Sequence, residues 1–181
     1  MSAGYHVDVI ALPGFGAWNL DGARIFRLRG LPFHCRSVSY LNRLFYGAQC
    51  FHIVRAVRPD VLNAIFLFDC GFLAASTGYH PLVLTPLGSD VLLYPFQKKK
   101  WMRMMRAMVR RADCILGNSA VMTSTLVNRL GAPADKVASL LWNGVDTQAF
   151  RPFDAQILKA RYTSRAGCLL FSNRLLSPLY N

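Results

Sequence analysis

Short apolar runs alternate with helix-forming segments along most of this chain, and this alternation most constrains its fold. Four runs have the length and composition of strands in a parallel sheet: residues 61–68, 82–85, 114–117 and 136–141. Segments with helical signals lie between them, at residues 71–77, 97–112 and 120–130. Because parallel strands need crossover connections, this order predicts an α/β fold, a Rossmann-like parallel sheet with helices on both faces.

The segments around these runs carry further signals. Residues 6–12 and 22–31 predict strands, the second at a sheet edge, and residues 155–162 predict a short helix. A longer helix is predicted at residues 38–57. Its apolar residues recur at three-and-four spacing and are expected to form the buried face: Leu41, Leu44, Phe45, Ala48, Phe51 and Val54.

The domain organisation follows from the spacing of these elements. We expect residues 1–152 to form one domain, and residues 153–181 to be a linker and the start of a second domain, with a strand at 167–172. The chain opens almost directly on a strand, and its tail is too short to bury a core of its own. The sequence therefore predicts part of a longer protein, shortened at both ends.

Hydrophobic residues make up 53% of the chain, but no segment predicts a membrane span. The most apolar stretch, residues 61–79, contains Asn63 and Asp69, so we interpret it as a buried strand followed by a helix. The five cysteines form no CxxC pair and have no metal-like spacing with the four histidines. Free thiols, no metal site and a cytoplasmic location are the expectation.

Charge sets this chain apart, because 21 lysines and arginines face nine acids, all of them aspartate. A net charge of +12 predicts attraction to polyanions such as anionic lipid, nucleic acid or phosphorylated small molecules. The segment 97–111, QKKKWMRMMRAMVRR, is the most basic and contains no acid.

Two interpretations of this basic segment remain open. In the first, a stripe of methionines packs into the core and the charges form a solvated face. In the second, the charged side chains face an anionic membrane: Lys98, Lys99, Lys100 and Arg103. A non-catalytic module that binds anionic membrane or RNA is therefore an alternative function, although no aromatic platform for RNA is evident.

A turn with Gly88, Ser89 and Asp90 follows the strand at residues 82–85. Ligands of open parallel sheets bind just past the carboxyl ends of the strands. Glycine lets a ligand approach the backbone, serine offers a hydroxyl group, and aspartate offers a carboxylate acceptor. These three residues are candidates for substrate binding, and a purely structural turn is the alternative.

Two more polar stretches have both a functional and a structural interpretation. Asn118 and Ser119 follow the strand at 114–117 and begin a helix. The sequence is equally compatible with binding of an anion by these residues and with a simple N-cap. Asn143, Gly144 and Asp146 predict a tight turn in which the carboxylate binds nearby backbone N–H groups, so this stretch is a candidate hinge between domains.

Four segments in this order resemble the N-terminal, acceptor-side domain of family 4 glycosyltransferases, which are retaining enzymes of the GT-B type. They are RPDVLNAIFLF at 58–68, PLVLTPLGSDV at 81–91, RADCILGNS at 111–119 and WNGVDTQAFRP at 142–152. The tail FSNRLLSPLYN, at 171–181, resembles the opening strand of the family's second domain.

The resemblance implies transfer of a sugar from a nucleotide-sugar to an acceptor, with no metal and no cofactor besides that co-substrate. It places the Gly88 turn in the cleft and Arg174 on the donor diphosphate. The acceptor would be a sugar, a lipid-linked molecule or a cell-surface polysaccharide precursor, met at the inner face of the plasma membrane. The family's first strand and most of its donor domain would lie outside this chain, so little activity is expected of it alone. A sugar-nucleotide epimerase shares the architecture, but its active-site signature is not visible.

The sequence departs from the family pattern at three places. Leu87 occupies a position where relatives often have histidine, and Asn63-Ala64-Ile65 replaces a frequent His-Ala-His. No lysine follows Arg174, where relatives often have one.

Overall fold

The structure is a computed structural model that describes residues 4–13, 22–30, 36–140, 144–152, 154 and 156–162. The chain divides into two compact units, Met1–Trp142 and Asn143–Asn181. The predicted strand at 167–172, together with Asn143 and Arg174, lies outside the described residues.

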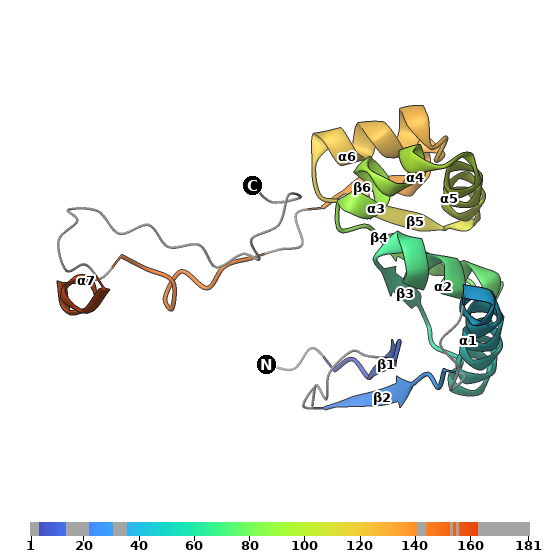
Figure 1. Ribbon diagram of the computed structural model, residues 1–181, viewed down its shortest axis with the longest axis horizontal. Helices are drawn as coiled ribbons and strands as arrows, with labels where there is room; N and C mark the ends of the chain where they lie inside the picture. Colours follow the sequence, from blue (N-terminus) through green and yellow to red (C-terminus); the bar gives the residue numbers. More distant parts are fainter. Residues whose placement is uncertain are drawn as a thin grey trace. The chain divides into compact units, whose positions relative to one another are not determined.

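A four-stranded parallel sheet is the centre of the first unit (Figure 1). Its strands follow the order of the chain: β3 (Leu62–Ile65), β4 (Leu82–Thr85), β5 (Cys114–Gly117) and β6 (Val137–Ser139). All three strand pairs are parallel, so the carboxyl ends of the four strands meet at one edge of the sheet, which we call the C-terminal edge. The predicted Rossmann-like α/β fold is confirmed.

Helical segments connect each strand to the next. After β3 come η1 (Leu67–Gly71) and α2 (Phe72–Ser76). After β4 come α3 (Ser89–Leu92), α4 (Tyr94–Gln97) and α5 (Lys99–Arg111). After β5 come α6 (Ala120–Ser124), η2 (Thr125–Arg129) and η3 (Ala134–Lys136).

The strand predicted at residues 61–68 is shorter in the structure. We expected residues 61–68, but β3 ends at Ile65. Phe66 has a φ of 70°, which breaks the extended backbone, and the chain then forms the π-type turn η1. The apolar run thus continues because Leu67 is buried in the core, not because the strand continues.

The core lies between β4, β5 and the inner face of α5. Leu84 and Thr85 are both buried, and because neighbouring strand residues point to opposite faces, β4 is covered on both sides. From α5, Met105, Met108 and Val109 pack into the same cluster as Leu84. The predicted methionine stripe is therefore core, and each such buried side chain contributes roughly 1.5–3 kcal/mol.

A separate parallel pair, β1 (Val7–Ala11) and β2 (Ala23–Arg27), precedes the main sheet in the chain. The Arg24 Nε donates to Asp8 Oδ1 at 2.7 Å across this pair. This hydrogen bond to Arg24 lowers the pKa of the Asp8 carboxyl below its usual value. Leu28, just after β2, packs with Cys50 and Leu73, which joins the pair to the helices beside the main sheet.

The long helix α1 (Arg36–Val57) forms as predicted, but its buried face is different. Of the expected apolar stripe, Val54 is buried. The larger members of the stripe are 37–58% exposed: Leu41, Leu44, Phe45 and Phe51. The helix instead turns Cys50 and Val54 inward, with Tyr46 and Ile53 packed alongside. The sequence pattern identified the apolar side chains correctly but not the side that is covered.

The second unit contains the helix α7 (Gln156–Tyr162). Before it, Asp146 Oδ1 accepts hydrogen bonds from the backbone N–H groups of Gln148 at 2.9 Å and Ala149 at 3.2 Å. The predicted backbone contacts of Asp146 are confirmed, and its role as a hinge with Asn143 and Gly144 stays a prediction. Across the described ranges, no helix is both long and apolar enough to cross a membrane.

Candidate functional site

The turn after β4 requires glycine for its backbone conformation. Gly88 has a φ of +146°, and a Cβ atom there would meet nothing within 4 Å. The requirement is therefore conformational rather than steric, because side chains rarely adopt this backbone angle. Ser89 begins α3 directly after it, and Leu87 is 47% exposed at the tip of the turn.

Asp90 holds this turn together from the inside. Its carboxylate accepts hydrogen bonds from the backbone N–H groups of Leu67 at 2.7 Å, Gly88 at 2.8 Å and Leu87 at 3.1 Å. The residue is fully buried. The contact with Leu67 ties the turn after β4 to the turn after β3. The predicted direct contact of Asp90 with a substrate does not fit this geometry, since the enclosed carboxylate is occupied by backbone donors.

The turn after β3 carries backbone strain that no sequence signal revealed. Phe66 is not glycine, yet its φ of 70° and ψ of 102° lie outside the usual regions. Its N–H donates to the Thr85 carbonyl at 3.0 Å, and the Leu67 N–H is held by Asp90. Strain of this kind persists only where the surroundings fix the backbone, and it is frequent at functional sites.

Ser119 is an N-cap, as one of the two interpretations predicted. Its Oγ accepts from the Met122 N–H at 3.3 Å at the start of α6. Gly117, at the end of β5, allows close packing, because a Cβ atom there would lie 2.6 Å from Thr123 Oγ1. The exposed Ser119 and the half-buried Asn118 lie at the C-terminal edge, and anion binding by them stays a prediction.

The sheet brings these two predicted turns to the same edge. Since β4 and β5 are hydrogen-bonded neighbours, the residues that follow Thr85 and those that follow Gly117 lie side by side. Arg174 and Asn143 lie outside the described residues, and Gly144 and Asp146 belong to the second unit. The predicted site is therefore assembled in part, around Gly88, Ser89, Asn118 and Ser119.

A hollow of about 350 Å³ lies at the C-terminal ends of β1 and β3 and was missed from the sequence. Leu12 and Pro13 follow β1, while Asp69 lies in η1 after β3, and α1 and α2 complete the wall with Asn42, Arg43, Tyr46 and Leu73. We call it the Arg43–Asp69 hollow. Its lining includes no residue of the two predicted turns.

An ion pair lies in the wall of this hollow. Arg43 Nη2 donates to Asp69 Oδ1 at 2.7 Å, and both side chains are partly exposed. The Arg43 guanidinium carbon also lies 5.7 Å from the ring centroid of Phe68 and 5.6 Å from that of Phe72. Two aromatic rings and a carboxylate thus hold the guanidinium in the wall of the hollow, and a guanidinium has five N–H donors with which it can meet a ligand with oxygen acceptors.

Burial disfavours the thiolate form of the two cysteines beside this hollow. Burial raises the pKa of the Cys50 thiol to about 11 and also raises the pKa of Cys70 above its usual value. Because only the thiolate reacts readily, neither thiol is activated near neutral pH. The three described cysteines are free thiols, as predicted. The described residues contain no group of three side chains suited to hold a metal ion.

The opposite edge of the sheet has a separate polar contact. Asp113 Oδ2 accepts from the Leu82 N–H at 2.7 Å and lies 2.6 Å from His80 Nδ1. The hydrogen bond from the Leu82 N–H group lowers the pKa of the Asp113 carboxyl most, and the hydrogen bond with His80 lowers it further. This contact fixes the start of β4, far along the strand from the Gly88 turn.

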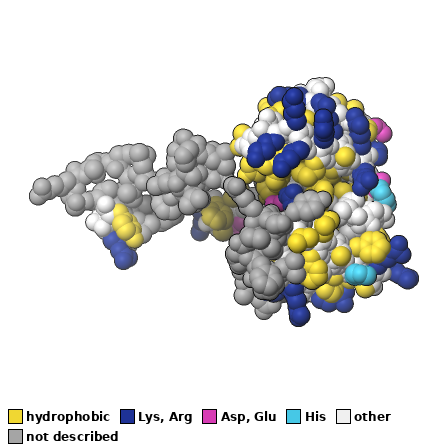
Figure 2. All heavy atoms as spheres, turned by 45° about the vertical axis from the view of Figure 1, so that its right-hand side comes forward, with side chains coloured by type: hydrophobic (Ala, Val, Ile, Leu, Met, Phe, Trp, Pro, Cys, Tyr) yellow, Lys and Arg dark blue, Asp and Glu magenta, His cyan; other side chains and the backbone are white. Residues whose placement is uncertain are grey.

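The basic residues of α5 form a second candidate surface. The side chains predicted to face a membrane are all exposed: Lys98, Lys99, Lys100 and Arg103. Within the part of the chain that the structure describes, no carboxylate forms an ion pair with any of them. Figure 2 shows dark blue side chains gathered on the upper part of the face it presents, with hydrophobic side chains below them.

Comparison with known proteins bears on the family and the fold of this chain. None of the curated proteins matches the chain. A family model described as Glycosyltransferase Family 4 matches residues 1–149, which is well over half of the 181 residues. The match covers the main sheet, both predicted turns, the Arg43–Asp69 hollow and the basic helix. As the resemblance implied, this chain belongs to Glycosyltransferase Family 4 and carries a glycosyltransferase domain.

Proposed function

We propose that this chain binds the acceptor in a reaction that moves a sugar from a nucleotide-sugar, with retention of configuration. The observation that carries the proposal is the Arg43–Asp69 hollow beside the C-terminal edge of the sheet. Open α/β sheets bind their ligands at this edge. Family membership supports sugar transfer in general, and the hollow supports the assignment of this domain to the acceptor.

The chemistry of the hollow suits a sugar. A carboxylate and a guanidinium placed side by side can accept from and donate to neighbouring hydroxyl groups of one ring. Tyr46 and Leu73 add apolar surface for the carbon face of that ring. Because Asp69 and Arg43 are already paired at 2.7 Å, little reordering of either side chain is needed when a sugar binds.

The predicted turns complete this proposal. Ser89 and Ser119 offer hydroxyl groups at the edge, with Gly88 and Asn118 beside them, and Arg174 is proposed to bind the donor diphosphate. The nucleotide-sugar is then a co-substrate, with no metal and no other cofactor. Asn143, Gly144 and Asp146 are proposed to orient the second unit, and little transfer by this chain alone stays a prediction.

We further propose a lipid-linked acceptor or polysaccharide precursor, met at the inner, anionic face of the plasma membrane. The support is that Lys98, Lys99, Lys100 and Arg103 are exposed and that, among the described residues, none of them forms an ion pair with a carboxylate. Binding of the chain to vesicles that contain phosphatidylglycerol, but not to phosphatidylcholine alone, is the expected result. Equal binding to both kinds of vesicle would contradict the membrane part of the proposal.

Calorimetric titration tests the acceptor part directly. Methyl glycosides and sugar phosphates are titrated into the wild type and into the Asp69→Asn and Arg43→Gln variants. We expect each substitution to weaken sugar binding about tenfold, since a hydrogen bond to a charged group is worth about 1.5 kcal/mol or more. Asp60→Asn is the matched control, because Asp60 is exposed and does not line the hollow.

Two results would count against the proposed function. If the Asp69→Asn and Asp60→Asn variants bind each sugar equally well, the hollow is not the acceptor site. If the chain alone transfers sugar rapidly from a nucleotide-sugar, its restriction to the acceptor side is wrong.

A further inference from the structure

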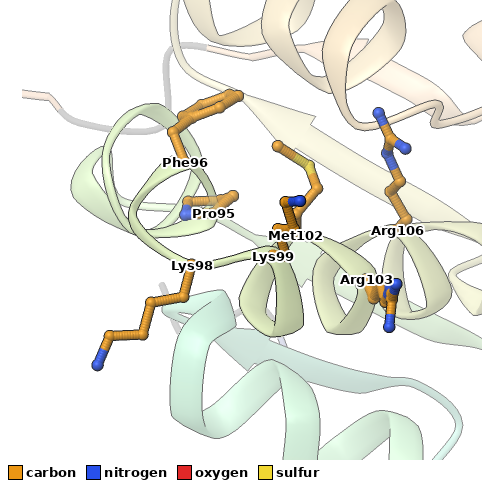
Figure 3. A pocket seen from close by; sticks show the side chains of 7 residues that line it. All are labelled: Pro95, Phe96, Lys98, Lys99, Met102, Arg103 and Arg106. Carbon is orange, nitrogen blue, oxygen red and sulfur yellow. The ribbon is translucent and has the colours of Figure 1, made fainter.

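A pocket of about 310 Å³ lies between α4 and the first turns of α5 (Figure 3). Phe96 and Met102 give it an apolar wall, and Lys99, Arg103 and Arg106 form a basic rim. Figure 3 shows Phe96 and Met102 directed to the same side, while Lys98 points away from them. We call this hollow the α4–α5 pocket. It combines a surface for hydrocarbon with several positive charges.

The charges of the rim are close to one another and lack acidic partners. Lys99, Arg103 and Arg106 follow each other at helical spacing on α5, where like charges repel. Arg106 Nη2 donates to the Arg129 carbonyl at 3.1 Å. The Arg129 guanidinium carbon itself lies 3.7 Å from the Phe96 ring centroid, so a further cation borders the pocket. Among the described residues, none of these cations forms an ion pair with a carboxylate.

A bound anion would relieve this repulsion, and the pocket wall indicates which kind. Phe96 and Met102 are half-buried, and Leu92 and Leu93, just before α4, are 41% and 39% exposed. Apolar side chains beside a cluster of Lys and Arg are typical of surfaces that meet anionic lipid. An isolated phosphate ion would use the rim but not the apolar wall.

The aromatic rings favour lipid over RNA. Proteins that bind single-stranded RNA stack its bases on open aromatic faces. Here the Arg129 guanidinium lies over the Phe96 ring, and Lys98 Nζ lies 4.7 Å from the Trp101 ring centroid. Trp101 also contacts Phe68 edge to face, with centroids 5.0 Å apart. These rings are engaged by neighbouring side chains.

We propose that the α4–α5 pocket holds the phosphate headgroup of an anionic membrane phospholipid, with Lys99, Arg103 and Arg106 on the phosphate. This proposal rests on the membrane location proposed above and gives it a defined site. The helices α3 and α4 follow the Gly88 turn directly, so a headgroup in the pocket fixes the position of that turn relative to the membrane. A lipid-linked acceptor would then meet the C-terminal edge without leaving the bilayer surface.

Vesicle sedimentation with matched double variants tests the pocket. The variant Lys99→Gln/Arg103→Gln removes two charges from the rim, and Arg110→Gln/Arg111→Gln removes two charges from the last turn of the same helix, outside the pocket and the predicted membrane-facing set. Each basic residue near an anionic surface contributes about fivefold to binding. We therefore expect about 25-fold weaker binding of the rim variant to vesicles with phosphatidylglycerol, and a loss of no more than about fivefold in the control.

Equal losses in the two variants would overturn the pocket, because diffuse attraction depends only on the number of charges. A second measurement uses dihexanoyl phosphatidylglycerol, a soluble lipid, and follows backbone amide signals of the wild type. Shifts are expected around Phe96 and Met102, and inorganic phosphate should bind much more weakly. Phosphate binding as tight as that of the lipid would overturn the lipid assignment, as would tighter binding of a single-stranded RNA to the same residues.

Sugar titration of the rim variant separates this proposal from the proposed function. The Arg43–Asp69 hollow does not include any rim residue, so sugar binding in solution should equal that of the wild type. Loss of sugar binding in the Asp69→Asn variant with intact vesicle binding supports both proposals. Normal vesicle binding by the rim variant would contradict the proposed lipid site but not the proposed acceptor site.

Discussion

The turn after β4 and the outer face of α5 both carry charged side chains. In the turn the charged group is buried and hydrogen-bonded, whereas on α5 the charged groups face solvent. In the turn, the Asp90 carboxylate is fully buried and accepts from three backbone N–H groups. On α5, Lys99 and Arg103 are exposed, and neither forms an ion pair with a carboxylate of the described residues. A charged group whose hydrogen bonds are all made inside the protein stabilises the fold. A charged group that is exposed and has no ionic partner can bind another molecule.

The largest effect is expected at Asp90. In an Asp90→Asn variant one acceptor oxygen is replaced by an NH₂ group that faces backbone donors. We expect the free energy of unfolding to fall by about 3 kcal/mol, as for loss of buried hydrogen bonds to a charged group. Urea denaturation measures it. The control Asp60→Asn, at an exposed position, should stay within about 0.5 kcal/mol of the wild type.

Unfolding of the Asp90→Asn variant at the wild-type urea midpoint would break the comparison, because the turn would then not depend on its buried carboxylate.

The next effect is expected at Gly88, whose φ of +146° suits only glycine. We expect Gly88→Ala to lower the free energy of unfolding by about 1–3 kcal/mol through backbone strain. Gly47, within α1, is the matched control, since a Cβ atom there meets only Ser76 Oγ at 3.6 Å. Gly47→Ala should stabilise by up to about 1 kcal/mol. If both alanine variants unfold alike in urea, the turn does not require glycine.

Asp113 gives an intermediate case, because its carboxylate also accepts from a backbone N–H group but is 41% exposed. The folded-state pKa is lowered from 3.8, so the stabilising contribution is present above that value and is lost as the pH falls through the folded-state pKa. We expect Asp113→Asn to lower the melting temperature at pH 6, and by much less than Asp90→Asn. The melting temperatures of the wild type and the Asp113→Asn variant should converge as the pH falls below 3.8. A difference that grows on acidification would show that the carboxylate is not stabilised in this way.

The smallest effect on stability is expected on α5. We expect Arg103→Gln to leave the free energy of unfolding unchanged, or to raise it by up to about 0.5 kcal/mol, because repulsion from Lys99 and Arg106 is removed. Added salt should then stabilise the wild type more than the variant, since salt screens the same repulsion. Destabilisation of more than about 1 kcal/mol in thermal or urea unfolding would mean that Arg103 supports the fold, against the contrast drawn with Asp90.

The fold was predictable from local sequence signals, and the site only in part. Alternation of apolar runs and helical segments places β4, β5 and the methionine face of α5 correctly, because burial on both faces leaves a continuous apolar run. Of the apolar stripe predicted for α1, Val54 is buried, but Leu44 and Phe45 are exposed. A pattern identifies which side chains are apolar, but tertiary packing decides which of them are covered.

The candidate site shows the same limit more strongly. Gly88 and Ser89 could be found because turn residues follow a strand, but a sequence does not reveal that Asp90 points inward. Arg43 and Asp69 lie 26 residues apart, on different elements, and only the folded chain brings them together. No composition signal distinguished these two residues from the other arginines and aspartates of the chain.

Amide chemical-shift mapping tests the central claim, that the C-terminal edge of the sheet binds the acceptor. Backbone signals of the ¹⁵N-labelled chain are followed while the methyl glycosides are added one at a time. We expect the sugars that bind to shift the amide signals of Arg43, Asp69, Gly88 and Ser89, and to leave the signals of His80 and Asp113, at the opposite edge, unchanged. Shifts confined to His80 and Asp113, or no shift with any sugar, would contradict this claim.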